Sequence, residues 1–371
     1  MPFLAIRPMD NKTQLPTFCF LSLALASDSV KSMSYSMTRP KMEMDNMTPD
    51  PTARITLGRT KLSVSRICFG LAPIGDMPDT YGYGVSTEQA RNTVRAIFDS
   101  PINFLDTSRN YGLGRSEERV GEVIRERGGL PAGFVISTKL DRDMDTNKFD
   151  GARARRSLEE SLKALGVDRI QLLHVHDPEY ASSLSDVTGA KGAITELFRM
   201  KEEGLVDAVG LAAGKVDIMM PILRDWDFDA LMTHNRFTLA NRHAKKMIEY
   251  ANERGIAVLN AAPYASGVLA KGSASHKRYV YQEATAEMMQ PIARIEEVCA
   301  RHGIPPGAAA LQFSMRDSRI AATACGISKP ERVAQTLEWA RYEIPPAAWE
   351  ELMALPFESD DPEASRVYKP T

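Results

Sequence analysis

Short apolar runs alternate with longer amphipathic stretches along the chain from residue 53 onward. Each run is rich in Val, Ile and Leu, and the segment that follows it carries apolar side chains at helical spacing. This alternation is typical of repeated βα units that build a parallel sheet. The pattern predicts eight strands, at residues 67–70, 103–107, 134–139, 169–176, 206–212, 229–234, 257–261 and 320–325.

Eight such units favour an α/β fold of the closed (β/α)8 type, a TIM barrel, over an open doubly wound sheet. An open dinucleotide-binding sheet would carry a Gly-x-Gly-x-x-Gly fingerprint early in the chain, and none follows the first predicted strands. A short N-terminal β-hairpin, at residues 54–57 and 62–64, is predicted to precede the barrel. Residues 177–190 and 262–284 are too long for tight turns, so we expect them to be loops over the barrel mouth.

The first 52 residues differ from the rest, and the predicted barrel domain covers residues 53–371. Residues 15–26 form an apolar run that ends in small side chains, as in a secretory signal peptide. Five methionines follow between residues 33 and 47, which is consistent with a start of translation further along the chain. A disordered leader or a mis-assigned start is favoured, and the run is too short to span a bilayer. We therefore expect a cytoplasmic protein, with export as the alternative.

Charge and cysteine content narrow the classes of partner. The chain has 46 Lys and Arg against 48 Asp and Glu, a net charge of −2, so no basic field attracts nucleic acid. Its four cysteines form no Cys-x-x-Cys pair, which favours a reducing compartment. We expect a small-molecule substrate, no nucleic acid or membrane partner, and a monomer or small homo-oligomer.

Ionisable residues end three consecutive predicted strands. They are Asp106, Lys139 and His176, and Tyr111 lies in the loop after the first of these strands. The carboxyl ends of TIM-barrel strands form the catalytic mouth, so we expect the four side chains to converge there. An ammonium group beside a phenol lowers the phenol's pKa, and a carboxylate would balance the buried ammonium. The set suits proton exchange with an alcohol or carbonyl, which is half of a hydride transfer; the other half needs a cofactor.

Two further features bear on this region. Ser116 is predicted to cap the helix that follows the Tyr111 loop. His174 and His176 form a His-x-His strand end that also fits a metal-dependent hydrolase, but Lys139 would repel a cation there. We therefore expect no metal site and interpret His174 as a buried polar core residue one layer deeper in the barrel.

Three motifs, in order, resemble those of the aldo-keto reductase superfamily over about residues 54–345. They are Asp106 followed by Tyr111-Gly112-x-Gly114-x-Ser116-Glu117, then Ser137-Thr138-Lys139, then Leu165-Gly166-Val167-Asp168 leading to His176-Asp177-Pro178. The resemblance implies an NAD(P)-dependent oxidoreductase with a catalytic tetrad. In it Tyr111 is the general acid and base, Lys139 lowers its pKa, Asp106 pairs with Lys139, and His176 orients the substrate oxygen.

The resemblance also places NAD(P) across the mouth, with its pyrophosphate and adenosine beside the last strand and the helix after it. Many NADPH-preferring relatives have a lysine where Gly326 stands, so NAD is expected and NADP is the alternative. The usual nicotinamide contacts are replaced by Ala212-Ala213, His234 and Ala261. The expected cofactor contacts are Ala212, His234, Ser266, Gly267, Leu269, Gly326, Ile327, Ser328, Arg332, Gln335 and Thr336.

These departures resemble the residues found at the same positions in one branch of the superfamily, which contains L-fucose, D-threo-aldose and pyridoxal dehydrogenases. His176-Asp177-Pro178 and the run Pro263-x-x-Ser266-Gly267-Val268-Leu269 also match that branch. The branch implies oxidation of an aldose or pyridoxal to its lactone. The alternatives are an NADPH-dependent general aldehyde and ketone reductase, a cofactor-bound regulatory subunit of a channel, and the metal-dependent hydrolase.

Overall fold

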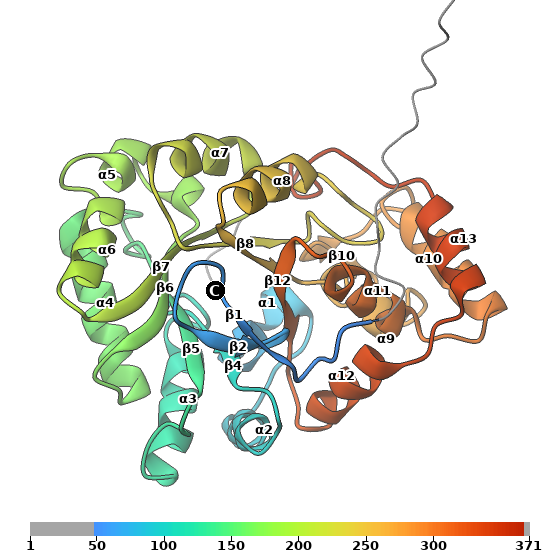
Figure 1. Ribbon diagram of the computed structural model, residues 1–371, viewed down its shortest axis with the longest axis horizontal. Helices are drawn as coiled ribbons and strands as arrows, with labels where there is room; N and C mark the ends of the chain where they lie inside the picture. Colours follow the sequence, from blue (N-terminus) through green and yellow to red (C-terminus); the bar gives the residue numbers. More distant parts are fainter. Residues whose placement is uncertain (1–47, 367–371) are drawn as a thin grey trace, which may run out of the picture. The chain divides into compact units, whose positions relative to one another are not determined.

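The computed structural model describes residues 48–366, and everything below concerns that part of the chain. Its centre is a closed barrel of parallel strands in the order β12-β3-β4-β5-β6-β7-β8-β9, and Figure 1 shows helices around these strands. The predicted (β/α)8 barrel is confirmed, because each barrel strand overlaps a predicted one. The strands are β3 (Ile67–Gly70), β4 (Phe104–Asp106), β5 (Val135–Leu140), β6 (Ile170–His176), β7 (Val206–Ala213), β8 (Ala230–His234), β9 (Ala257–Ala261) and β12 (Ile320–Gly326).

Amphipathic helices connect the strands and cover the outside of the barrel. Among residues 48–366 no helix is long and apolar enough to cross a membrane. The longer helices are α2 (Thr87–Phe98), α3 (Arg115–Glu126), α4 (Gly151–Leu165), α6 (Ala193–Glu202), α7 (Val216–Asp225), α8 (Lys245–Glu253), α10 (Gln290–Arg301), α11 (Pro306–Met315), α12 (Glu331–Arg341) and α13 (Pro346–Ala354).

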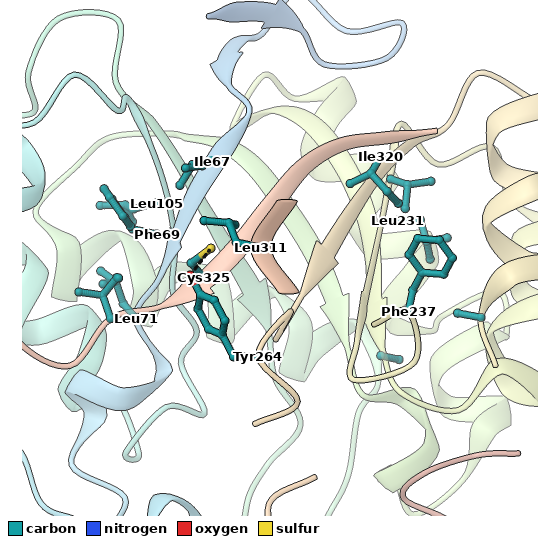
Figure 2. Close-up of a cluster of buried hydrophobic side chains, with 14 of the residues drawn as sticks. Ile67, Phe69, Leu71, Leu105, Leu231, Phe237, Tyr264, Leu311, Ile320 and Cys325 are labelled. Atoms are coloured by element: carbon teal, nitrogen blue, oxygen red, sulfur yellow. Dashed lines mark hydrogen bonds between the residues drawn. The ribbon is translucent and has the colours of Figure 1, made fainter. Parts of the chain in front are cut away.

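Side chains alternate between the two faces of the barrel strands, as the period of two requires. On β3, Ile67 and Phe69 belong to the large cluster between strands and helices, which also contains Leu105 and Leu311 (Figure 2). Cys68, between them, belongs to a second cluster inside the barrel. The barrel interior is therefore a packed core, and the room for a ligand lies at its mouth.

The predicted N-terminal hairpin is confirmed as β1 (Arg54–Thr56) paired antiparallel with β2 (Ser63–Ser65). Leu57 and Val64 join the cluster inside the barrel, so the hairpin closes the end at which the strands begin. Residues ahead of it also contact the barrel, because the Thr48 hydroxyl donates a hydrogen bond to Gln312 Oε1 at 2.7 Å. Most of the predicted leader, residues 1–47, lies outside the described residues.

The segments at the carboxyl ends of the strands carry structure of their own. Short helices and strands lie in the segments after β3, β6 and β9. Sequence analysis predicted the last two of these segments as long loops. The chain after α13 then runs beside the segment that follows β8, where the Arg242 amide donates to the Glu358 carbonyl at 2.8 Å. The short elements are η1 (Ala72–Gly75), α1 (Pro78–Tyr81), η2 (Pro178–Tyr180), α5 (Leu184–Thr188), α9 (Val268–Lys271), β10 (Arg278–Tyr279) and β11 (Gln282–Glu283).

Candidate active site

A cavity opens at the carboxyl ends of the strands, and all four predicted catalytic residues line it. Asp106 ends β4, His176 ends β6, and Lys139 lies one residue before the end of β5. Because β4, β5 and β6 are neighbours in the barrel, their ends bring these side chains together. Tyr111 reaches them from the loop between β4 and α3, and its ring lies edge-on to the His176 ring with 5.9 Å between centroids.

Lys139 and Asp106 form a buried ion pair below Tyr111. The Lys139 ammonium donates to Asp106 Oδ2 at 2.6 Å and to the Thr107 carbonyl at 2.7 Å, while the Ser137 hydroxyl donates to Asp106 Oδ1 at 2.9 Å. The two side chains are only 1% and 4% exposed, so these hydrogen bonds replace the water that both charges have lost. Lys139 Nζ lies 4.6 Å from the centre of the Tyr111 ring.

The pKa of Tyr111 departs from its ordinary value in the direction opposite to the one expected from the sequence. Burial, and after it the negative charge of Asp106, raise the pKa of Tyr111 well above 10. The Lys139 ammonium, which is paired with Asp106 at 2.6 Å, leaves this upward shift in place. Tyr111 is therefore a phenol at neutral pH, ready to donate a proton.

His176 is held by a carboxylate that the sequence analysis did not identify. Asp141 Oδ1 lies 2.6 Å from His176 Nδ1, and Asp141 Oδ2 accepts hydrogen bonds from the Ser108 hydroxyl at 2.6 Å and the Asn110 amide at 2.8 Å. Asp141 comes directly after β5 and two residues after Lys139, so the two side chains point to the same face of the sheet. This spacing of two residues could have indicated from the sequence that Asp141 belongs to the site. The contact fixes the ring of His176 and leaves Nε2 for the substrate oxygen.

The carboxylates around His176 favour its charged form. Burial opposes the charge most strongly, but Asp177 and Asp141 together outweigh it and raise the pKa of His176. Burial likewise opposes the charge of Asp141, and the nearby His176 together with three hydrogen bonds lowers the pKa of Asp141. Both shifts favour the charged form of each partner, and a charged His176 donates a stronger hydrogen bond to a substrate oxygen than a neutral one.

We expect Asp141→Asn to destabilise the protein by about 1.5–3 kcal/mol, and to do so most strongly in mildly acidic solution. The raised pKa of His176 stabilises the fold below about pH 6.5 and this is lost as the pH rises through the folded-state pKa. The lowered pKa of Asp141 stabilises it above about pH 4 and this is lost as the pH falls through the folded-state pKa. Thermal unfolding of both proteins at pH 5.5 and 8.5 checks this; an equal loss at both values contradicts it.

Ser116 does not cap α3, so that prediction is wrong. The helix begins at Arg115, and its N-cap is Gly114. The φ of Gly114 is 103°, a backbone conformation that glycine adopts without strain. Ser116 lies inside the helix and donates to the Leu71 carbonyl at 2.9 Å. The next residue, Glu117, is fully buried and accepts a hydrogen bond from Thr138 at 2.6 Å, and burial raises its pKa to about 7. These contacts hold the Tyr111 loop to its neighbours.

His174 lies one layer below His176, as expected for a core residue. It is fully buried, and burial, with the charge of Lys139, lowers its pKa to about 3, so the ring is neutral. Ser137 Oγ lies 3.4 Å from its Nδ1. Within residues 48–366 no group of three or more His, Cys, Asp or Glu side chains is placed to hold a metal ion.

Most of the residues expected to contact the cofactor lie on the cavity wall. Leu269 is instead 1% exposed in the core, and the Gln335 side chain accepts a hydrogen bond from Arg332. The contacts of all these residues with a cofactor stay predictions. Those that line the cavity are Ala212, His234, Ser266, Gly267, Gly326, Ile327, Ser328, Arg332 and Thr336.

The end of the cavity beside α12 fits a dinucleotide. Lys271 and Arg332 both line it, and no carboxylate of the described chain forms an ion pair with either. Burial, and then the charge of Arg332, lower the pKa of Lys271, so the two cations repel each other until an anion lies near them. The start of α12 adds the positive end of a helix dipole. These charges suit a pyrophosphate.

Another part of the cavity wall is formed by the chain after α13, from which the sequence predicted no site residue. Arg366 lines the cavity over the Tyr281 ring at 4.9 Å and pairs with Glu363 at 2.7 Å. Glu363 also lies 3.1 Å from Nδ1 of His234, which ends β8. Tyr264 also lines the cavity, but its side chain is largely buried and its hydroxyl lies 3.7 Å from Cys325 Sγ (Figure 2).

Comparisons with known proteins identify the family of this chain. Residues 66–355 match the Aldo/keto reductase family. The chain belongs to this family. As an aldo-keto reductase it is an NAD(P)-dependent oxidoreductase, and its barrel and cavity are those of an enzyme.

Several relatives of this aldo-keto reductase are named. D-threo-aldose 1-dehydrogenase of a Pseudomonas species is 30% identical over 318 residues, which cover 78% of this chain and 94% of that protein. Pyridoxal 4-dehydrogenase of Microbacterium luteolum is 28% identical over 332 residues, 79% of this chain and 94% of that protein. The holo form of an aldo-keto reductase from Bacillus halodurans matches with a TM-score of 0.68 at 18% identity, over 85% of this chain and 99% of that chain, which shows the shared fold.

Proposed function

We propose that this aldo-keto reductase oxidises the cyclic hemiacetal of a small polar aldehyde, an aldose or pyridoxal, to its lactone, with NAD as the hydride acceptor. The observation that carries the proposal is the convergence of Tyr111 and His176 over the buried Lys139–Asp106 pair in one cavity. Similarity to an aldose dehydrogenase and a pyridoxal dehydrogenase, each matched over 94% of its length, supports the class of substrate.

Each residue of the set has one task in this proposal. When bound, the nicotinamide takes the hydride from the reacting carbon. His176 Nε2 holds the oxygen on that carbon, while Tyr111 Oη exchanges its proton. Lys139, 4.6 Å from the phenol ring centre, stabilises the phenolate that must form before Tyr111 can accept a proton. In the direction of reduction the buried phenol is already in the form that donates.

Turnover of the purified full-length chain tests this proposal. NAD and NADP are each offered with a panel of aldoses and with pyridoxal, and NADH and NADPH with simple aldehydes. Formation of reduced cofactor together with a lactone supports the proposal. Reduction of aldehydes with NADPH, without oxidation of any sugar or of pyridoxal, would contradict it and would identify a general carbonyl reductase.

The proposed preference for NAD rests on Gly326, which offers no side chain to a 2′-phosphate. We expect Arg332→Ala to raise the Kd of NAD by about tenfold, because a charged hydrogen bond to the nucleotide is lost. Quenching of tryptophan fluorescence on titration with NAD and with NADP measures the Kd of each cofactor. Arg341→Ala is the matched control, since Arg341 is exposed at the far end of the same helix. An unchanged Kd in Arg332→Ala, or tighter binding of NADP than of NAD by the unmodified chain, would contradict the assignment.

We also propose that residues 53–371 act as one catalytic unit in the cytoplasm. Cys68, Cys299 and Cys325 are free and buried, which suits a reducing compartment. Fractionation of cells that produce the full-length chain, followed by detection of the protein in each fraction, tests this localisation.

A further inference from the structure

Asp177 has an unusual backbone conformation at the edge of the catalytic cavity. It follows His176 directly, its φ is 44°, and its amide donates to the Ala212 carbonyl of β7 at 2.9 Å. A positive φ is uncommon for a residue with a side chain, although Asp and Asn adopt it more readily than most. The turn η2 starts immediately afterwards, so the backbone fixes the Asp177 side chain on the cavity wall.

The carboxylate of Asp177 differs from those of Asp106 and Asp141 in the hydrogen bonds that it receives. Asp106 accepts hydrogen bonds from Lys139 and Ser137, and Asp141 accepts them from Ser108 and the Asn110 amide. No donor within residues 48–366 hydrogen-bonds to the Asp177 carboxylate, although its side chain is only 13% exposed. Because Asp177 lines the cavity and receives no hydrogen bond from the described chain, its carboxylate is suited to accept hydrogen bonds from a ligand there.

The Asp177 carboxylate lies close to the place where the reacting carbon of the substrate would bind. Asp177 Oδ2 lies 3.7 Å from His176 Nε2, the atom that holds the oxygen on the reacting carbon. At 3.7 Å the contact is too long for a hydrogen bond, so Asp177 does not compete for that proton. When His176 Nε2 holds the oxygen on the reacting carbon, an oxygen on the neighbouring carbon would come close to the Asp177 carboxylate.

We propose that Asp177 accepts a hydrogen bond from the hydroxyl on the carbon next to the reacting one, so that the site selects substrates that carry this 2-hydroxyl. This inference rests on the proposed function for its choice of aldoses. It adds a specificity-determining contact, because a buried acceptor left without its donor penalises the analogue that lacks the hydroxyl.

Two variants test the contact without straining the backbone. Asp177→Gly removes the carboxylate and is compatible with a positive φ, while Asp177→Asn keeps an acceptor oxygen and also tolerates this region. The best aldose of the panel is compared with its 2-deoxy analogue. The unmodified enzyme is expected to prefer the 2-hydroxyl form by roughly 10- to 100-fold in kcat/KM, Asp177→Gly to lose that preference, and Asp177→Asn to keep part of it.

Glu179→Gln is the matched control for charge. Glu179 lies in the same turn, but its carboxylate accepts the Gly214 and Lys215 amides at 3.1 Å each. It should keep the full preference for the 2-hydroxyl. If Asp177→Gly retains the preference, or if Glu179→Gln loses it equally, direct recognition by Asp177 is contradicted.

A binding measurement separates recognition from turnover. The 1,5-anhydro analogue of the aldose has no anomeric hydroxyl and cannot react, so calorimetry with the enzyme saturated with NAD gives its Kd. Asp177→Gly should weaken this binding by roughly 10- to 100-fold, and unchanged binding would contradict the inference. If the chain only reduces aldehydes, the proposed function fails, and the same preference is then measured between 2-hydroxypropanal and propanal.

Discussion

Tyr111→Phe is expected to lower kcat by about 10²–10⁴-fold while the Kd of the cofactor stays unchanged. The substitution removes the one hydroxyl group that exchanges a proton with the substrate and keeps the ring that packs edge-on against His176. Steady-state kinetics and a fluorescence titration with NAD measure the two quantities. Tyr81→Phe is the matched control, because Tyr81 also lines the cavity but lies against Tyr281. Turnover within a few-fold of the unmodified enzyme would contradict the role of Tyr111.

The raised pKa of Tyr111 adds a pH signature to this experiment. Oxidation needs the phenolate, whose fraction grows with pH, so kcat/KM for oxidation should rise through the whole range below about pH 10. Reduction needs the phenol and should not show that rise. In Tyr111→Phe the rise of the oxidation rate should be absent.

Lys139→Met should have the largest effect on stability and abolish most of the activity. It leaves Asp106 buried without its counter-charge, which typically costs about 3–5 kcal/mol. The side chain of Asp106 is 4% exposed, so water cannot replace the lost ammonium. Denaturant unfolding gives the free energy of unfolding, and turnover with the best substrate gives the activity.

The double variant Lys139→Met, Asp106→Leu separates the two roles of this pair. Replacing a whole buried ion pair by apolar side chains is often close to neutral for stability, so the double variant should regain much of the lost stability. It should not regain activity, because no charge then stabilises the phenolate of Tyr111. Recovery of both, or loss of stability without loss of activity, would show that the pair is only structural.

The barrel could be predicted because its signal is local. Each strand is a short apolar run followed by an amphipathic stretch, and all eight predicted strands overlap observed ones. The convergence of Asp106, Lys139 and His176 followed as well, since residues at the ends of neighbouring parallel strands share one mouth. Tyr111 joined them from its place in the loop after the first of these strands, and the resemblance to a family supplied the roles of the four residues.

What could not be predicted depends on contacts between distant segments. Glu363 reaches His234 across more than a hundred residues, and no local pattern near the C-terminus indicates this. The direction of the Tyr111 pKa shift depends first on how completely the folded chain buries the phenol and then on the nearby charge of Asp106, and neither can be read from the sequence. The residue type of Ser116 favours a cap, but the backbone turns at Gly114 and the helix starts at Arg115.

Transfer of deuterium from the substrate to the cofactor tests the central claim most directly. The full-length enzyme is incubated with NAD and the best aldose labelled with deuterium at carbon 1, and the cofactor and sugar product are analysed by mass spectrometry. We expect singly deuterated NADH and an equal amount of lactone together with the aldonic acid that its hydrolysis gives. Unlabelled NADH, or a sugar product that is neither the lactone nor this acid, would contradict hydride transfer from the anomeric carbon.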